Sequence, residues 1–158
     1  MAEFDVVVLG GGLSGTKAAL RAAELGGKVC LVEKGIVGRK GFLRRNVLLA
    51  ECRSDKDPVK WVSQLERQEK LAVEYCENLE SKFAEAGILL LKGEGSLAGP
   101  GEVSVQGEEK VQTVTGKSLI LACGSDPSFP PTLPREENVI ISIDEIYQLK
   151  AIPEKVLI

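Results

Sequence analysis

The sequence contains no histidine, and this absence excludes several kinds of catalytic site. Without an imidazole, the chain supplies no Ser-His-Asp triad, no Cys-His pair and no histidine-based metal site. Its four cysteines include no CxxC or similarly close pair, so a redox or zinc pair adjacent in the sequence is also excluded. They are Cys30, Cys52, Cys76 and Cys123. We expect reduced thiols that pack as small core residues, with no metal site and no catalytic residue.

Long apolar runs and an excess of positive charge are missing as well. The longest apolar runs, such as residues 6–9 and 88–91, are too short to span a bilayer. The N-terminus lacks the basic segment and cleavage pattern of a signal peptide. A net charge of −3 gives no electrostatic footprint for nucleic acid. We therefore expect a cytoplasmic protein that binds neither membrane nor nucleic acid, with a single domain over residues 1–158.

The order of apolar runs and glycines at the N-terminus predicts an α/β fold. Residues 4–9 form a β-branched run typical of a strand that is buried on both faces. Residues 14–25 have helical periodicity and end at Gly26 and Gly27, which are suited to stop a helix. Residues 28–33 return to a strand, and such a crossover places its two strands parallel and adjacent. These features predict a Rossmann-like parallel sheet with flanking helices.

The middle of the chain predicts a long amphipathic helix. Asp57 and Pro58 suit a helix start, and the helix can extend to about residue 86, with Gly87 as its stop. Apolar residues at spacings of three and four form one stripe, which we expect to pack against the sheet. They are Val62, Leu65, Ala72, Cys76, Leu79, Phe83 and Ala86.

Further strands follow this helix. Residues 88–92 and 118–122 are expected as short, buried strands. Between them, residues 94–116 alternate valines with polar residues and glycines, which predicts a small antiparallel β-meander. Towards the C-terminus, a short segment at 139–143 precedes a short helix that we expect near 144–149 and the start of a strand at 154–158.

Residues 10–15 read GGGLSG, a GxGxxG motif between the first strand and the first helix. Gly10 permits a tight turn, Gly12 lets a pyrophosphate approach the backbone, and Gly15 lets the helix lie close to the sheet. The N–H groups and positive dipole at the start of the helix favour phosphates. Glu33, at the end of the second strand, can accept hydrogen bonds from a ribose diol. A plain glycine turn with a surface glutamate is the alternative, and the complete context favours a dinucleotide site.

With these residues, the chain resembles the N-terminal FAD domain of the pyridine-nucleotide disulfide oxidoreductases, and among them the dihydrolipoamide dehydrogenases. The resemblance rests on residues 4–15, the alanine-rich helix after them, the VCLVEKG segment at 29–35 and ILACGSDP at 120–127. GEGS at 93–96 is similar to the family segment that passes the adenine. This resemblance covers essentially the whole chain. It implies FAD as the cofactor, since the family binds FAD at this site.

The resemblance also implies which residues contact each part of FAD. The pyrophosphate would lie against Gly10, Gly12, Leu13, Ser14 and Gly15. The adenosine would lie against Glu33, Lys34 and Gly95. The linker to the flavin would lie under Ala122, Cys123 and Gly124. Cys123 stands where the family usually has threonine, and it is either a linker contact without a hydroxyl or a core thiol beside the site.

The chain departs from the family in two ways. The CxxxxC redox disulfide is missing, since residues 38–46 contain no cysteine and Cys52 has no partner at the family spacing. Thiol–disulfide exchange therefore cannot proceed here in the usual way. The nicotinamide-binding and C-terminal dimerisation domains are also missing, so NAD(P) would bind only through regions outside this chain. We expect a piece of a longer polypeptide whose full-length form is a homodimer.

A basic segment replaces the disulfide stretch, and its role is open. Arg39, Lys40, Arg44 and Arg45 follow one another without an acidic residue between them. They could face the flavin, with Arg39 as a cofactor contact, or attract an acidic partner. The alternative is a solvated, charged loop.

Three functions remain at this stage. The first is the FAD-binding domain of an oxidoreductase that moves electrons between NAD(P)H and an acceptor through FAD, with the acceptor reduced directly by the flavin. The second is a non-catalytic module of the same fold that docks a partner protein. The third, an NAD-only dehydrogenase domain, is disfavoured because Lys34–Gly35 and residues 122–124 indicate a flavin.

Overall fold

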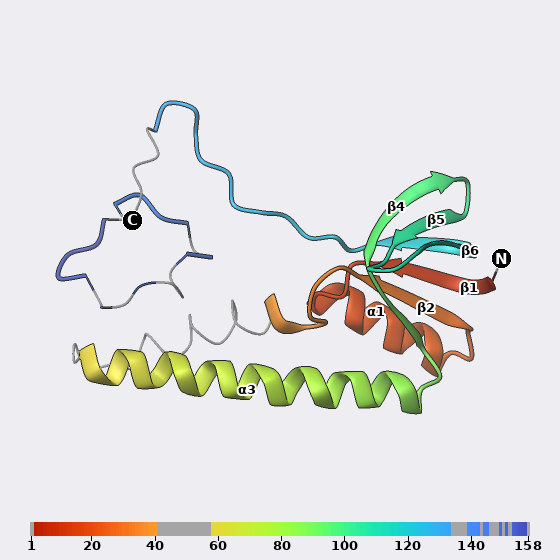
Figure 1. Cartoon of the computed structure of the whole chain (residues 1–158), viewed down its shortest axis with the longest axis horizontal. Coiled ribbons are helices and arrows are strands. Elements are labelled where there is room, and N and C mark those ends of the chain that lie inside the picture. Colours follow the sequence, from red (N-terminus) through yellow and green to blue (C-terminus); the bar gives the residue numbers. More distant parts are fainter. Residues whose placement is uncertain are drawn as a thin grey trace. The chain divides into compact units, whose positions relative to one another are not determined.

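The computed structural model describes residues 2–40, 58–133, 139–142, 144–145, 149, 151 and 153–157. The chain divides into two compact units, of which the first contains residues 1–41 and 73–124 and the second contains residues 42–72 and 125–158. The first unit carries the whole β-sheet (Figure 1). That residues 1–158 act as one domain stays a prediction.

Six strands form one sheet in the order β3-β2-β1-β6-β5-β4. Their bounds are β1 Ala2–Leu9, β2 Val29–Glu33, β3 Leu89–Lys92, β4 Glu94–Gly99, β5 Glu102–Gln106 and β6 Val111–Leu121. β1 pairs in parallel with β2 and β6, and β2 pairs in parallel with β3. β4, β5 and the first half of β6 pair antiparallel. The predicted parallel sheet with a small β-meander is confirmed.

β6 is one strand of 11 residues where the sequence predicted two. Its residues 111–115 pair with β5, and residues 114–121 lie along β1. Gly116 lies where the partner changes, and its N–H donates to the Gly101 carbonyl at 2.8 Å. A Cβ at Gly116 would lie only 2.8 Å from Cγ2 of Val7, so glycine lets the strand continue past that side chain.

Two strands are less buried than the sequence predicted. Ile120 and Leu121 at the end of β6 are 36% and 61% exposed, since β1 is the one described strand that pairs with this half of β6. Leu89 of β3 is 43% exposed because β3 lies at the edge of the sheet. The predicted burial on both faces holds for Val7 and Val8 of the central strand, which are 1% and 0% exposed.

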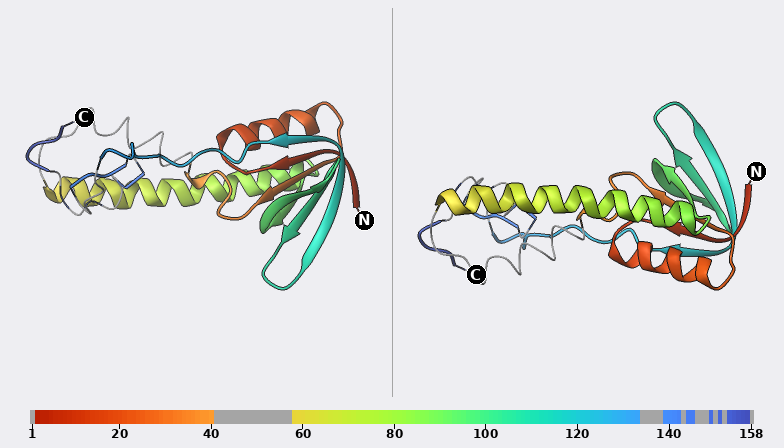
Figure 2. Two further views of the ribbon diagram at one scale, coloured as in Figure 1. Left: turned by 90° about the horizontal axis from the view of Figure 1, so that it is seen from above. Right: turned by 90° about the horizontal axis from the view of Figure 1, so that it is seen from below.

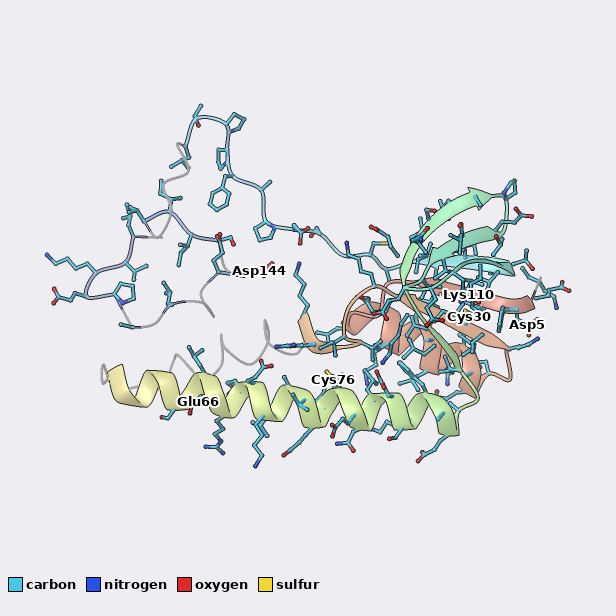
Figure 3. The ribbon with its side chains drawn as sticks, viewed as in Figure 1. Asp5, Cys30, Glu66, Cys76, Lys110 and Asp144 are labelled. Carbon is cyan, nitrogen blue, oxygen red and sulfur yellow. The ribbon has the colours of Figure 1, made fainter. Side chains whose placement is uncertain are left out.

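The two predicted helices are confirmed as α1 Leu13–Glu24 and α3 Pro58–Glu85. Four of the predicted stripe residues on α3 are buried: Ala72, Cys76, Leu79 and Phe83. Figure 3 shows Cys76 on the upper side of the helix. Ala86 lies beyond the helix and is exposed, while the Val62 side chain and Asp57 lie outside the described part of the chain. Gly87 has a φ of +67° and ends the helix as predicted, and the Ile88 N–H turns back to the Phe83 carbonyl at 2.9 Å.

The sheet is covered on both faces. On one face α1 and the C-terminal part of α3 pack over a cluster that includes Val8, Leu31 and Phe83. On the other face the β-meander contributes Val103 and Val105 to a cluster with residues of β1 and β2. Figures 1 and 2 show the two helices and the meander on their separate sides.

The cysteine predictions are confirmed in part. Cys30 and Cys76 are buried, and burial raises the pKa of the Cys30 thiol to about 12. Cys123 is exposed, so its interpretation as a core thiol is wrong. Cys52 lies outside the described residues.

The strand expected to begin at residue 154 is wrong as far as this region is described. Residues 139–142 and 154–157 contain turns, bends and irregular backbone without strand pairing. A short apolar run becomes a strand only where another strand satisfies its backbone groups. The helix expected near 144–149 lies mostly outside the described residues. Within the described part of the chain, no helix is both long and apolar enough to cross a membrane.

Candidate functional site

The turn of residues 10–15, called the glycine turn below, requires glycine at two of its three predicted motif positions. Gly10 has a φ of +99°, and a Cβ there would collide with the carbonyl oxygen of Ala122. A Cβ at Gly15 would collide with the carbonyl oxygen of Gly10, so α1 can start close to the sheet only with glycine at this position. These two residues have the tight-turn and close-packing roles that the motif predicts.

Gly12 differs from these two because the packing of the protein does not require it. Apart from Gly12 itself and its two chain neighbours, no residue of the described chain has an atom within 4 Å of a Cβ built at Gly12. Gly12 also precedes the first residue of α1, offers no side-chain hydrogen bond to the helix end, and is followed by a first turn without an acidic residue. The N–H groups at such a helix start favour an anion. The open space beside Gly12 therefore fits a pyrophosphate.

Glu33 is held beside the glycine turn by two backbone amides. The N–H of Gly11 donates to its Oε2 at 2.5 Å, and the N–H of Gly35 donates to its Oε1 at 2.7 Å. An ionised carboxylate has about four acceptor positions, so these two bonds leave it able to accept from a ribose diol. The ribose contact of Glu33 stays a prediction.

The segment that follows Glu33 packs over the glycine turn. The N–H of Gly38 donates to the Gly11 carbonyl at 2.7 Å, and buried Val37 has its Cγ2 at 2.5 Å from a Cβ built at Gly11. Gly38 has a φ of +78°, and a Cβ there would lie 2.9 Å from Tyr75 and Leu79 of α3. Gly11 and Gly38, which the GxGxxG motif does not specify, must therefore be glycine for these segments to pack.

The second glycine signature meets the first through the pairing of β1 and β6. The N–H of Ala122 donates to the Leu9 carbonyl at 2.7 Å, and the Ala122 Cβ lies 3.2 Å from a Cβ built at Gly15. The Cys123 thiol donates to the same Leu9 carbonyl at 3.7 Å. Gly124 has a φ of +71° and no described atom within 4 Å of its Cβ position. The structure therefore brings residues 122–124 to the glycine turn.

Gly95 and Lys34 lie nearby with contacts that the sequence did not predict. A Cβ at Gly95 would collide with Cδ2 of Leu9, so glycine lets β4 cross close over β1. Lys34 is exposed, and its Nζ lies 3.8 Å from Oε1 of Glu94. Their predicted contacts with adenine and ribose stay predictions.

The remaining predicted contacts lie at the margins of the site. Leu13 and Ser14 are exposed at the start of α1, as contacts with a pyrophosphate require. Arg39 follows Gly38, is partly exposed, and donates its backbone N–H to the Ile36 carbonyl at 3.3 Å. Arg44 and Arg45 lie outside the described residues, so the role of the basic segment stays open.

Three glycines of the site were missed by the sequence reasoning. Gly11 and Gly35 hold the Glu33 carboxylate, and Gly38 bonds to Gly11. The second glycine of the GGG run and the two glycines at 35 and 38, after Glu33, were visible signals. Their partners come from separate segments of the chain, which no local pattern specifies.

Comparison with known proteins places this geometry in a family. The profile described as pyridine nucleotide-disulphide oxidoreductase matches residues 4–158. Leghemoglobin reductase of Glycine max is 30% identical over 99% of this chain and 34% of its own length. Dihydrolipoyl dehydrogenase of Manduca sexta is 29% identical over 99% of this chain and 35% of its own length. The chain thus spans about a third of the length of these relatives.

A solved structure shares the fold. The Cu(II) complex of the HOCl-induced flavoprotein disulfide reductase RclA from Escherichia coli superposes with a TM-score of 0.71 at 18% identity, covering 96% of this chain and 35% of that chain. The match of the family profile along nearly the whole sequence shows that the chain belongs to the pyridine nucleotide-disulphide oxidoreductase family.

Proposed function

We propose that this chain is the FAD-binding part of a flavoprotein oxidoreductase similar to dihydrolipoyl dehydrogenase. The observation that carries the proposal is the open space at Gly12, which lies between Glu33 and the start of α1. Contacts within the protein do not require glycine at this position. A pyrophosphate needs this combination of close backbone approach and helix N–H groups. When bound, FAD supplies the electron-transfer chemistry, and the protein supplies binding and orientation.

Each part of the site has a binding role in this proposal. The glycine turn and the first turn of α1 hold the two phosphates, and Glu33 accepts hydrogen bonds from the adenosine ribose. Gly95 leaves β4 without a side chain close to the end of β1, where the adenine would lie. Residues 122–124 would close over the linker to the flavin, with the exposed Cys123 thiol in place of a hydroxyl.

The missing disulfide shapes the proposed reaction. Because residues 38–46 contain no cysteine, a disulfide at the family position cannot relay electrons. The acceptor would take electrons directly from the flavin, and NAD(P)H would bind through regions outside this chain. The acceptor's identity is not specified by any residue of the site.

An FAD titration followed by flavin fluorescence tests the proposal, with Gly12→Val as the site variant. Valine at this position would occupy the open space and displace the phosphates, so FAD binding should weaken at least about tenfold, as expected for the loss of charge-assisted hydrogen bonds. Gly99→Val is a matched control, since its Cβ position has only ordinary contacts, 3.4–4.0 Å away, with the Glu102 side chain.

The outcomes separate the candidate functions. Equal FAD binding by the parent and Gly12→Val would show that the site is assigned to the wrong residues. No FAD binding by the parent would count against the oxidoreductase and favour a module of this fold that docks a partner protein.

A further inference from the structure

Glu33 ties together two segments of backbone that are not adjacent in the sequence. Its Oε2 accepts from Gly11 in the glycine turn, and its Oε1 accepts from Gly35 after β2. Both bonds are within the protein, so they exist without a nucleotide. A carboxylate that accepts from two N–H donors makes stronger bonds than a neutral acceptor does.

The segment held by Glu33 makes its own contact with the glycine turn. Gly38 donates to the Gly11 carbonyl at 2.7 Å, so Gly11 is bonded through its N–H to Glu33 and through its carbonyl to Gly38. Val37 is 1% exposed and packs against Gly11 from the same segment. Residues 35–38 and the glycine turn therefore form one hydrogen-bonded unit with Glu33 between them.

We infer that Glu33 is a positioning residue, which fixes residues 35–38 against the glycine turn before a nucleotide binds and so strengthens nucleotide binding independently of any ribose contact. The identity of the ligand in this inference rests on the proposed function. The ordering of residues 35–38 in the free protein does not depend on that function. A site that is already ordered loses less conformational freedom when the ligand binds, and this gain in affinity does not require a direct contact.

Two variants separate positioning from charge. Glu33→Gln keeps the length of the side chain, but its amide has one acceptor oxygen and one NH₂ donor, so it cannot accept from both amides. Glu33→Asp keeps the charge, but it is one methylene too short to reach both amides. Glu24→Gln is the matched control, because Glu24 forms an exposed ion pair with Arg21 on the surface of α1.

Amide hydrogen exchange of the free chain, measured by NMR, is the first test. Gly38 is the reporter, since its N–H bonds to Gly11 and not to Glu33. Its exchange rate relative to that of Val8 in the centre of β1 should rise about tenfold in both Glu33 variants and stay unchanged in Glu24→Gln. Because the ratio cancels a general loss of stability, an unchanged ratio in the Glu33 variants would overturn the inference.

Calorimetric titration with ADP and with 2′,3′-dideoxy-ADP is the second test. Positioning predicts that Glu33→Gln weakens binding of 2′,3′-dideoxy-ADP about five- to tenfold, although this ligand has no ribose hydroxyls. The proposed ribose contact adds a further loss for ADP. A loss confined to ADP would mean that Glu33 acts only by contact with the ribose, and the inference would be wrong. If the parent binds neither ligand, the proposed function fails, while the exchange ratio still decides whether Glu33 orders the segment.

Discussion

At the scale of single residues, Asp5 connects three segments of the chain. Its Oδ2 accepts from the backbone N–H of Lys28 at 2.8 Å, and its Oδ1 lies 2.7 Å from Nζ of Lys117. β1, the turn before β2 and the middle of β6 are thereby joined at one carboxylate. Figure 3 shows Asp5 close to the N-terminal end of the chain.

The contacts of Asp5 predict a pH-dependent contribution to stability. The hydrogen bond from Lys117, and after it the Lys28 N–H, hold the pKa of Asp5 below its usual value. A carboxyl group whose folded pKa is lowered stabilises the fold above its unfolded pKa of about 3.9, and this contribution is lost as the pH falls through the folded pKa. The Tm of Asp5→Asn should therefore fall less than the Tm of the parent as the pH is lowered from about 5 to about 2.

A variant at an ordinary surface carboxylate controls for the general effect of acid. Glu108→Gln, in the exposed turn between β5 and β6, should keep the pH dependence of the parent. If Asp5→Asn and Glu108→Gln gave the same curve, the ion pair with Lys117 would contribute nothing to stability, as is common for exposed pairs.

At the scale of elements, α3 carries the largest of the fully buried side chains in the described part of the chain. Phe83 is 1% exposed and packs in the cluster on the helical face of the sheet. Leu79 and Tyr75, one and two turns earlier, pack close to Gly38 beside the glycine turn. The same helix thus supports both the core and the segment that Glu33 orders.

Truncation of Phe83 should be among the costliest single changes in this chain. Phe83→Ala should lower the free energy of unfolding by about 3–5 kcal/mol, the usual cost of deleting a buried aromatic ring. Leu71→Ala on the same helix, where Leu71 is 39% exposed, should cost less than about 1 kcal/mol. Urea denaturation measures both, and similar losses in the two variants would show that the buried stripe does not stabilise the helix.

The elements show what the sequence could predict and what it could not. The strand after residue 4, the GxGxxG turn and the stripe on α3 are local patterns. The structure confirms the first two, and it confirms the stripe at Ala72, Cys76, Leu79 and Phe83. The continuous β6 was missed because Gly116 looks like a break, and only its contacts with Val7 and Gly101 show why the strand continues. Gly11 and Gly38 were missed for the same reason, since their roles depend on partners from other segments.

At the scale of the whole molecule, the parallel pairing of β1 and β6 assembles the site from both ends of the first unit. Leu9 and Leu121 are paired, so the two turns that follow them, residues 10–15 and 122–124, lie together. In the proposed function, residues 10–15 hold the phosphates that ADP and FAD share, and residues 122–124 lie over the linker to the flavin. No described contact is specific to the isoalloxazine ring.

This distribution predicts which half of FAD the chain recognises. ADP at about 100 times its dissociation constant should stabilise the fold by about 2.7 kcal/mol, which is a rise in Tm of about 5–10 °C for a chain of this size. FAD at the same multiple of its own dissociation constant should give a similar rise. Riboflavin, which lacks the phosphates and the adenosine, should change Tm by less than about 1 °C at any concentration at which ADP is effective.

Thermal unfolding of the parent and of Gly12→Val with each of the three compounds measures this preference. The rise with ADP should disappear in Gly12→Val at the same ligand concentration, because its side chain displaces the phosphates that ADP and FAD share. A larger rise with riboflavin than with ADP would show that the chain holds the flavin ring instead. The cofactor contacts would then have to be sought beyond the glycine turn, since no described aromatic side chain lies within 4 Å of a Cβ built at Gly12.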